Sequence, residues 1–117
     1  MILAALLLAA AAASPAPDAA RTFQKCISCH SLDPEEMDLP GPHLKGVLGR
    51  RAATVPDFGY SEALQKAGAG GLVWTRETLG KFLDNPESIA PGTMMAKPPR
   101  TTPQEREQLY GLFSTAE

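Results

Sequence analysis

Large aromatic side chains are scarce in this sequence. Its 117 residues include one tryptophan, two tyrosines and four phenylalanines. A single domain of about 100 residues buries only a modest share of its surface, so a core with few large side chains is marginal. Either a large apolar cofactor supplies the missing volume or a thin aliphatic core suffices, and composition alone leaves both open.

The sequence also lacks any run of lysine or arginine. The formal charge is -2 at pH 7, and nothing concentrates positive charge against phosphates, which argues against nucleic acid as a partner. Eleven prolines and ten glycines, by contrast, are many for this length and occur in short clusters. This pattern predicts short helices joined by ordered loops.

No apolar run is long enough for a stable membrane span, which takes about 20 residues. The longest run, residues 2–13, contains only isoleucine, leucine and alanine and is followed by Ser14-Pro15-Ala16-Pro17. We expect residues 1–16 to be an export signal cleaved near Ala13 or Ala16, and residues 17–117 to be the mature domain. No basic residue precedes Arg21, so an upstream start or an uncleaved anchor is the alternative.

The mature domain is predicted to be all-α, with helices at both ends and long ordered loops between them. Asp18 is placed to cap a first helix, and residues on one face of that helix are Ala19, Ala20, Phe23 and Ile27.

Two shorter helices are expected in the middle of the chain. Ser61 caps residues 62–67, which Gly68 ends, and Thr75 caps a helix that Asn85 and Pro86 stop. Residues 31–56 and 86–101 are expected to be loops. The buried face of the helix after Thr75 is expected to hold Leu79, Phe82 and Leu83.

The last helix has the clearest start signal. Thr102 is its expected cap, Pro103 its first residue and Glu105 the second member of a capping box. Its buried stripe is expected to hold Leu109, Leu112 and Phe113.

The only two cysteines are separated by two residues and followed directly by histidine, in Cys26-Ile27-Ser28-Cys29-His30. Cys-x-x-Cys-His is the attachment motif of c-type haem. Two thiols at this spacing can add to the two vinyl groups on one porphyrin edge. His30 then lies over the iron and donates an imidazole nitrogen, so the motif predicts one covalently attached haem.

Three other uses of the cysteines are less well supported. A structural zinc site needs four ligands, and only Cys26, Cys29, His30 and the distant His43 are available. A thioredoxin-like redox pair belongs to a βαβ setting that this sequence lacks. A disulfide across two residues is strained and leaves the histidine without a role.

A methionine-containing turn offers a second iron ligand. Haem iron in electron-transfer cytochromes is typically held by histidine and methionine. Met94 and Met95 lie in a Pro-Gly-Thr-Met-Met turn far from His30, whereas Met37 is too near His30 to reach the opposite face easily. A methionine is often only core filler, but a loop rich in proline and glycine is an unusual place for filler.

Together these segments resemble the class I cytochrome c family, of the mitochondrial cytochrome c and bacterial cytochrome c2 type. The resemblance runs from about Asp18 to the C-terminus and implies a cytochrome c fold, with loops wrapped around one thioether-linked haem c. Beyond the cysteine motif it rests on Leu-Pro-Gly-Pro-His-Leu-Lys-Gly-Val-Leu-Gly-Arg-Arg at 39–51, Tyr60-Ser61, Trp74, Glu77-Thr78-Leu79, Phe82-Leu83-Asp84-Asn85-Pro86 and Pro91-Gly92-Thr93-Met94-Met95.

The resemblance also implies roles for individual residues. Pro42 offers its carbonyl to the second nitrogen of His30, and Met95 is the sulfur ligand. Haem propionates are costly to bury without hydrogen-bond donors. Donors for them match Arg50, Tyr60 and Trp74, with Thr93 a further hydroxyl beside the propionates or the ligand loop.

The terminal helices depart from the family pattern. Asp18 and Thr22 replace a small glycine and an aromatic, and Phe23 stands one position later. Leu112 likewise replaces an aromatic in the last helix, with Phe113 next to it. We expect the two shifts to compensate for each other in the helix contact.

Two further departures concern the haem edge. Lys97-Pro98-Pro99 replaces an apolar stretch after Met95, which favours a looser methionine side. The family's docking lysines are depleted: Lys25 is kept, but Glu87 and Met94 occupy positions that are often lysine. Steering towards an acidic partner is therefore expected to be weak and little affected by salt.

The resemblance implies a soluble, monomeric, monohaem electron carrier in the bacterial periplasm, not an enzyme. Its expected donors are complexes of the quinol:cytochrome c reductase type, and its acceptors are oxidases or reaction centres of a respiratory or photosynthetic chain. Two alternatives stay open: a small peroxidase-like haem protein if Met95 dissociates, and a haem module of a larger respiratory complex that retains residues 2–13.

Overall fold

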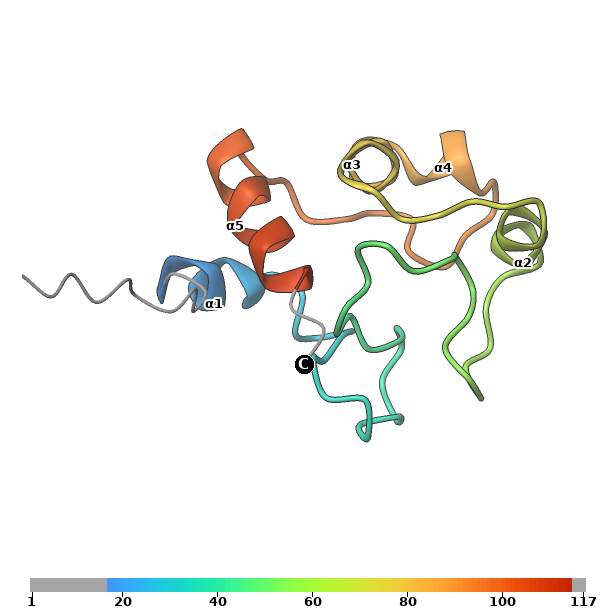
Figure 1. Cartoon of the computed structure of the whole chain (residues 1–117), viewed down its shortest axis with the longest axis horizontal. Helices are drawn as coiled ribbons and strands as arrows, with labels where there is room; N and C mark the ends of the chain where they lie inside the picture. The colour runs from blue at the N-terminus through green and yellow to red at the C-terminus, as the bar shows by residue number, and fades with distance from the viewer. Residues whose placement is uncertain (1–16, 115–117) are drawn as a thin grey trace, which may run out of the picture.

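Five short helices form the regular structure of residues 17–114, the part of the chain that the computed structural model describes (Figure 1). Those residues include no strand, only an isolated antiparallel bridge between Arg51 and Val73. The all-α prediction is thereby confirmed, whereas the expected export signal, residues 1–16, lies outside the described residues. The helices are α1 (Pro17–Phe23), α2 (Glu62–Ala69), α3 (Arg76–Asp84), α4 (Pro86–Ile89) and α5 (Pro103–Phe113).

Side-chain caps fix where three of the helices begin. The Ser61 hydroxyl accepts the first hydrogen bond of α2, as expected from its position. Thr75 and Thr78 form a reciprocal capping box at the start of α3, and Thr102 and Glu105 form another at the start of α5. These contacts satisfy backbone N–H groups that a helix leaves unpaired in its first turn.

The first helix differs from its prediction at both ends. It begins at Pro17, so Asp18 lies in its first turn and does not cap it. It ends at Phe23, where the Cys26 amide turns back to bond the Phe23 carbonyl at 2.8 Å. Because the chain has left helical register by then, Ile27 is 47% exposed, and its predicted place on the buried face is wrong.

The middle helices carry two more corrections. The second helix continues to Ala69, and Gly68 lies inside it. A Cβ at position 68 would lie 2.1 Å from the Ala52 carbonyl oxygen, so this glycine is needed for a close approach and does not end the helix. Pro86 does stop α3, but it also begins α4 because a proline fits the first helical position.

The terminal helices pack against each other and hold the two ends of the chain together. The rings of Phe23 and Phe113 meet edge to face with centroids 6.1 Å apart. Beside them the Thr22 hydroxyl donates a 2.6 Å hydrogen bond to the Gln108 side-chain oxygen. The displaced aromatics that were expected to compensate for each other are therefore in contact.

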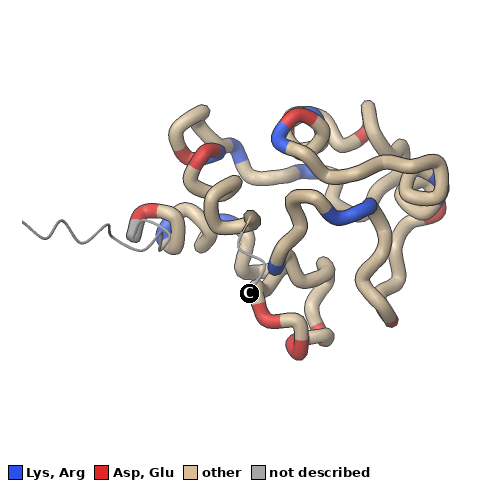
Figure 2. The backbone as a smooth tube through the Cα atoms, viewed as in Figure 1, with Lys and Arg blue, Asp and Glu red and all other residues tan. Residues whose placement is uncertain are grey.

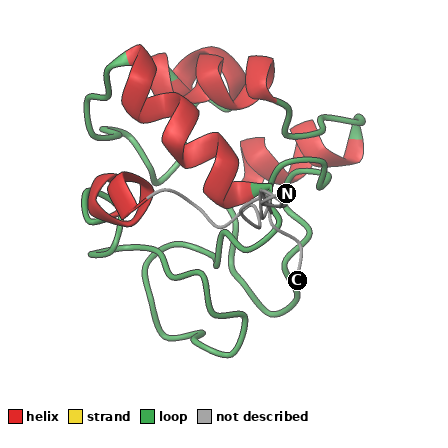
Figure 3. Cartoon of the chain, turned by 60° about the vertical axis from the view of Figure 1, so that its left-hand side comes forward, coloured by secondary structure: helices red, strands yellow, loops and turns green. Residues whose placement is uncertain are grey.

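Helices and loops occupy different parts of the molecule, and Figure 3 shows most of the helices above the longest loops. Two segments run side by side at the boundary. The Gly49 amide bonds the Trp74 carbonyl at 2.7 Å, and the Trp74 amide bonds the Arg50 carbonyl at 2.9 Å. The indole of Trp74 packs edge to face on Phe82 at 5.2 Å. This pairing brings Arg50 and Trp74 to the same cavity.

No helix among the described residues is both long and apolar enough to cross a bilayer.

Candidate functional site

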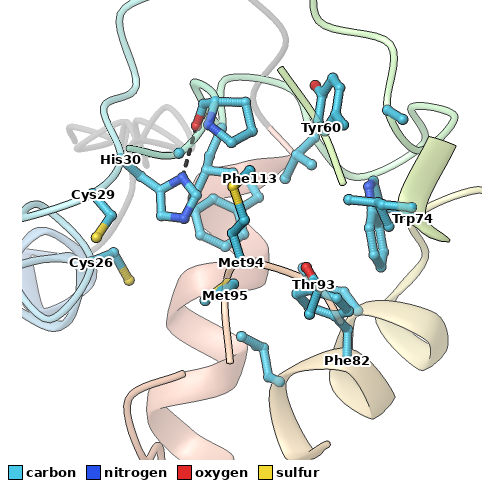
Figure 4. Close-up of a pocket in the computed structure, with 18 of the residues that line it drawn as sticks. Cys26, Cys29, His30, Tyr60, Trp74, Phe82, Thr93, Met94, Met95 and Phe113 are labelled. Carbon is cyan, nitrogen blue, oxygen red and sulfur yellow. Dashed lines mark hydrogen bonds between the residues drawn. The ribbon is translucent and has the colours of Figure 1, made fainter. Parts of the chain in front are cut away.

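A pocket of about 380 Å³ lies between the helices and the long loops (Figure 4). Every residue that the sequence predicted for the site lies on its wall. These residues are Cys26, Cys29, His30, Pro42, Arg50, Tyr60, Trp74, Thr93 and Met95. The structure thus gathers into one place residues that are up to 69 positions apart in the chain, from Cys26 to Met95.

His30 is buried and held by its Nδ1 atom. That nitrogen lies 2.7 Å from the Pro42 carbonyl oxygen. Because a carbonyl can only accept, Nδ1 carries the proton and donates it, which leaves the Nε2 lone pair available. Burial lowers the pKa of His30, and the Pro42 hydrogen bond opposes this only in part. A neutral imidazole with a free Nε2 is what a metal requires.

The backbone behind His30 is tightly packed. The Gly41 amide donates to the Cys29 carbonyl at 2.7 Å, and the Leu44 amide donates to the Ser31 carbonyl at 2.8 Å. A Cβ at position 41 would lie 2.3 Å from Cε1 of His30, so only glycine lets the backbone pass so close to the ring. The orientation of the imidazole is therefore built into the local chain.

The two cysteines lie beside the His30 ring at one edge of the pocket (Figure 4). Both are free thiols; Cys26 is half-buried and Cys29 is exposed. Burial raises the pKa of the Cys26 thiol, against a smaller opposite effect of Lys25. A pair of reduced thiols next to a neutral imidazole is the donor set that covalent haem attachment needs.

Hydrogen-bond donors line another wall. The Arg50 guanidinium is half-buried and donates to the carbonyls of His43, at 3.0 Å, and Lys45, at 3.1 Å. The Tyr60 oxygen accepts from the Val55 amide at 2.9 Å, so its own proton is available to another acceptor. Burial lowers the pKa of Arg50 and raises that of Tyr60, which favours an anionic partner for this wall.

Trp74 and Thr93 add two further donors. Both residues are buried at the pocket wall. Neither the indole N–H of Trp74 nor the hydroxyl of Thr93 has a hydrogen-bond partner among residues 17–114. Their availability suits the carboxylates of a bound group.

The methionines come from the loop after α4. The Thr93 amide bonds the Ala90 carbonyl at 3.0 Å and turns the chain towards the pocket. Met95 is half-buried against the core, whereas Met94 is 64% exposed, although both line the pocket. Figure 4 shows both side chains at the pocket. Burial thus favours Met95 over Met94 as the residue committed to the interior.

Sequence reasoning missed much of the apolar lining of the pocket. Loop residues of this kind share no helical or strand period, which is the signal that usually identifies core positions. Their only sequence signal is the presence of apolar side chains inside loops rich in proline and glycine. Examples are Leu44, Val47, Phe58 and Pro99.

The residues present fit a haem. The pocket is apolar with thiols at one edge and donors at another, and the Nε2 of His30 has no competing partner in the described chain. By contrast, no cluster of three or more His, Cys, Asp or Glu side chains in residues 17–114 could hold a bare metal ion. The site therefore defines a protein that binds haem through its cysteines.

Comparison with known proteins agrees with this class. No family model matches the sequence. The chain is 40% identical over 96 residues to cytochrome c2 of Agrobacterium tumefaciens (strain II Chrys), covering 80% of this chain and 86% of the relative. It is 39% identical over 90 residues to cytochrome c2 of Rhodopila globiformis, covering 77% and 81%.

Solved structures show the same relationship. Cytochrome c2 from Rhodospirillum centenum matches with a TM-score of 0.73 and 32% identity, over 82% of this chain and 92% of that one. Cytochrome cH from Methylobacterium extorquens matches with a TM-score of 0.70 and 30% identity, over 86% and 97%. The chain belongs to the class I c-type cytochromes, among the relatives of cytochrome c2. It has the cytochrome c fold and carries one covalently bound haem c in electron transport.

Proposed function

We propose that this chain is a soluble, monomeric electron carrier whose haem is attached to Cys26 and Cys29 and ligated by His30 and Met95. The observation that carries the proposal is the hydrogen bond from His30 Nδ1 to Pro42, which leaves Nε2 available at the pocket. The half-buried thioether of Met95 comes from a different loop on the same pocket. An imidazole and a thioether together are the usual ligand pair of electron-transfer cytochromes.

The bound haem supplies a one-electron couple between ferrous and ferric iron. Around it, Pro42 holds the His30 ring in one orientation, and the apolar wall excludes water. Arg50, Tyr60 and Trp74 are the donors for the propionates, with Thr93 beside them. Two protein ligands leave no position for a substrate, so the protein is a carrier and not an enzyme.

We also propose that the protein works in the periplasm, between donors of the quinol:cytochrome c reductase type and oxidase or reaction-centre acceptors. The relatives named cytochrome c2 support this assignment. Docking to them relies little on long-range charge, because many basic residues already have acidic neighbours (Figure 2). Within residues 17–114 the basic members of ion pairs are Arg21, Lys25, Lys66, Arg76, Lys81 and Arg106.

Exchanging each methionine for leucine tests the ligand assignment. Met95→Leu removes the sulfur with little change in volume, and Met94→Leu is the matched control one residue away. We expect the weak far-red sulfur-to-iron band of the oxidised protein to be lost in Met95→Leu and kept in Met94→Leu. Loss of the band in Met94→Leu alone would assign the ligand to Met94, and its absence from the wild type would reject methionine ligation.

A further inference from the structure

The loop that carries Met95 has few contacts of its own. We call residues 90–102, between α4 and α5, the methionine loop. No hydrogen bond or ion pair joins its residues 94–99 to any other part of the described chain, 17–114. Packing of Met95 against the core is therefore supplemented only at the two ends of the loop.

The upstream end is fixed by its own neighbourhood. The Thr93 amide bonds the Ala90 carbonyl, and the Gly92 amide bonds the Glu87 carboxylate of α4 at 3.0 Å. Gly92 has a φ of 81°, a left-handed turn that glycine adopts without strain. These are contacts between residues close in sequence.

The downstream end is fixed by two cations from distant parts of the chain. The ammonium of Lys25, directly before Cys26, donates to the Arg100 carbonyl at 3.0 Å. The same ammonium pairs with the Glu105 carboxylate of α5 at 2.9 Å. The Lys25 side chain is 38% exposed and its charge is engaged inside the molecule.

Arg106 provides the second cation. Its Nε and Nη2 atoms donate to the Thr101 hydroxyl at 3.2 and 3.0 Å. Its Nη1 atom pairs with the Asp84 carboxylate of α3 at 3.0 Å, and the side chain is only 19% exposed. Adjacent residues of the loop, Arg100 and Thr101, are thus held by side chains from two different elements.

The chain between these cations and Met95 is stiff. Pro98 and Pro99 fix their φ angles and have no amide to donate, which explains part of the missing hydrogen bonding. A proline pair acts as a semi-rigid extended spacer. A displacement at Arg100 or Thr101 is therefore passed on to Met95 instead of being absorbed between them.

We propose that Lys25 and Arg106 are positioning residues for the Met95 ligand, clamping the downstream end of the methionine loop. This rests on the proposed ligation by Met95. It changes the interpretation of Lys25, which the sequence suggested as a docking lysine. It also explains how Lys97-Pro98-Pro99 can stand after the ligand without releasing it.

The test compares four variants of the oxidised holoprotein. Lys25→Met removes the ammonium and keeps the apolar stem, and Thr101→Val removes the hydroxyl that Arg106 holds. Lys25→Arg is the conservative rescue. Arg76→Met is the control, because Arg76 also links α3 to α5, through Glu107 and the Tyr110 ring, without a printed contact to the methionine loop.

The readouts are the far-red sulfur-to-iron band and the rate at which cyanide replaces the methionine ligand. Because hydrogen bonds to charged groups are among the stronger ones, we expect Lys25→Met and Thr101→Val each to accelerate replacement roughly fivefold. Lys25→Arg and Arg76→Met should stay within about twofold of the wild type.

Equal rates in all variants of a wild type that shows the band would overturn the clamp and leave Met95 ligation intact. Acceleration in Arg76→Met as large as in Lys25→Met would also overturn it, because general loosening of the helices would then suffice. A wild type without the band would instead reject the proposed ligation itself.

Discussion

The two sides of the haem pocket are built in different ways. On the histidine side, His30, Gly41 and Pro42 are joined by hydrogen bonds between residues at most 12 positions apart. On the methionine side, the residues around Met95 make no such bonds, and the nearest anchors reach Arg100 and Thr101 from distant elements. The histidine side is therefore fixed by local backbone, and the methionine side depends on the assembled fold.

This difference indicates which contacts each ligand depends on. The histidine ring keeps its orientation as long as the turn from Cys26 to Leu44 is formed. Met95 keeps its position only while α1, α3 and α5 stay together, because Lys25 follows α1, Asp84 ends α3 and Arg106 lies in α5. The methionine side is thus expected to be the first to open.

The largest effect is expected from removing the aromatic contact between α1 and α5. Phe23→Ala and Phe113→Ala should each lower the free energy of unfolding by about 3 kcal/mol, because each empties a buried site. Denaturant titration of the holoprotein measures this loss. The double variant should cost less than the sum, since the rings touch each other. A near-neutral Phe23→Ala would contradict the idea that the two displaced aromatics compensate.

A smaller effect, confined to the histidine side, is expected from Gly41→Ala. The added Cβ would overlap the His30 ring, and overpacking of this kind costs about 2 kcal/mol. Gly59→Ala is the matched control, because nothing lies within 4 Å of a Cβ there. Unfolding free energies of both holoproteins decide the point. Equal values for the two variants would show that the ring is not held against this backbone.

The smallest effect concerns the charge of Glu105 and its dependence on pH. Hydrogen bonds from the Thr102 amide and from Lys25 hold the pKa of this carboxyl below its usual range. A depressed pKa stabilises the folded state above the unfolded value of about 4.3, and this contribution is lost as pH falls through the folded value.

Glu105→Gln keeps an acceptor for the capping box and removes only the charge opposite Lys25. Wild type should therefore exceed Glu105→Gln in melting temperature at pH 7, and the gap should close below about pH 4. Thermal unfolding at a series of pH values measures it. A gap that is the same at acid and neutral pH would exclude the ion pair as its source.

The parts of the fold that could be predicted are those encoded by neighbouring residues. The cysteine motif, the capping boxes at Thr75 and Thr102 and the proline-rich loops are all local signals. Errors arose where tertiary contacts override local preference. Gly68 looked like a helix stop but is required by its approach to Ala52.

The site shows the same division. Motif and spacing identified Cys26, Cys29 and His30, and resemblance supplied the other residues of the pocket wall. The engagement of Lys25 by Glu105 spans 80 positions and is encoded by neither signal. It required the packing of α1 against α5 to become visible, as did the apolar loop residues of the pocket.

The most direct test of this account is a denaturant titration of the oxidised holoprotein followed by two signals at once. The far-red sulfur-to-iron band reports the methionine side, and helical circular dichroism reports the assembled fold. We expect the band to disappear at a lower denaturant concentration than the helical signal. Coincident loss of the two signals would contradict an arrangement in which the methionine side opens first.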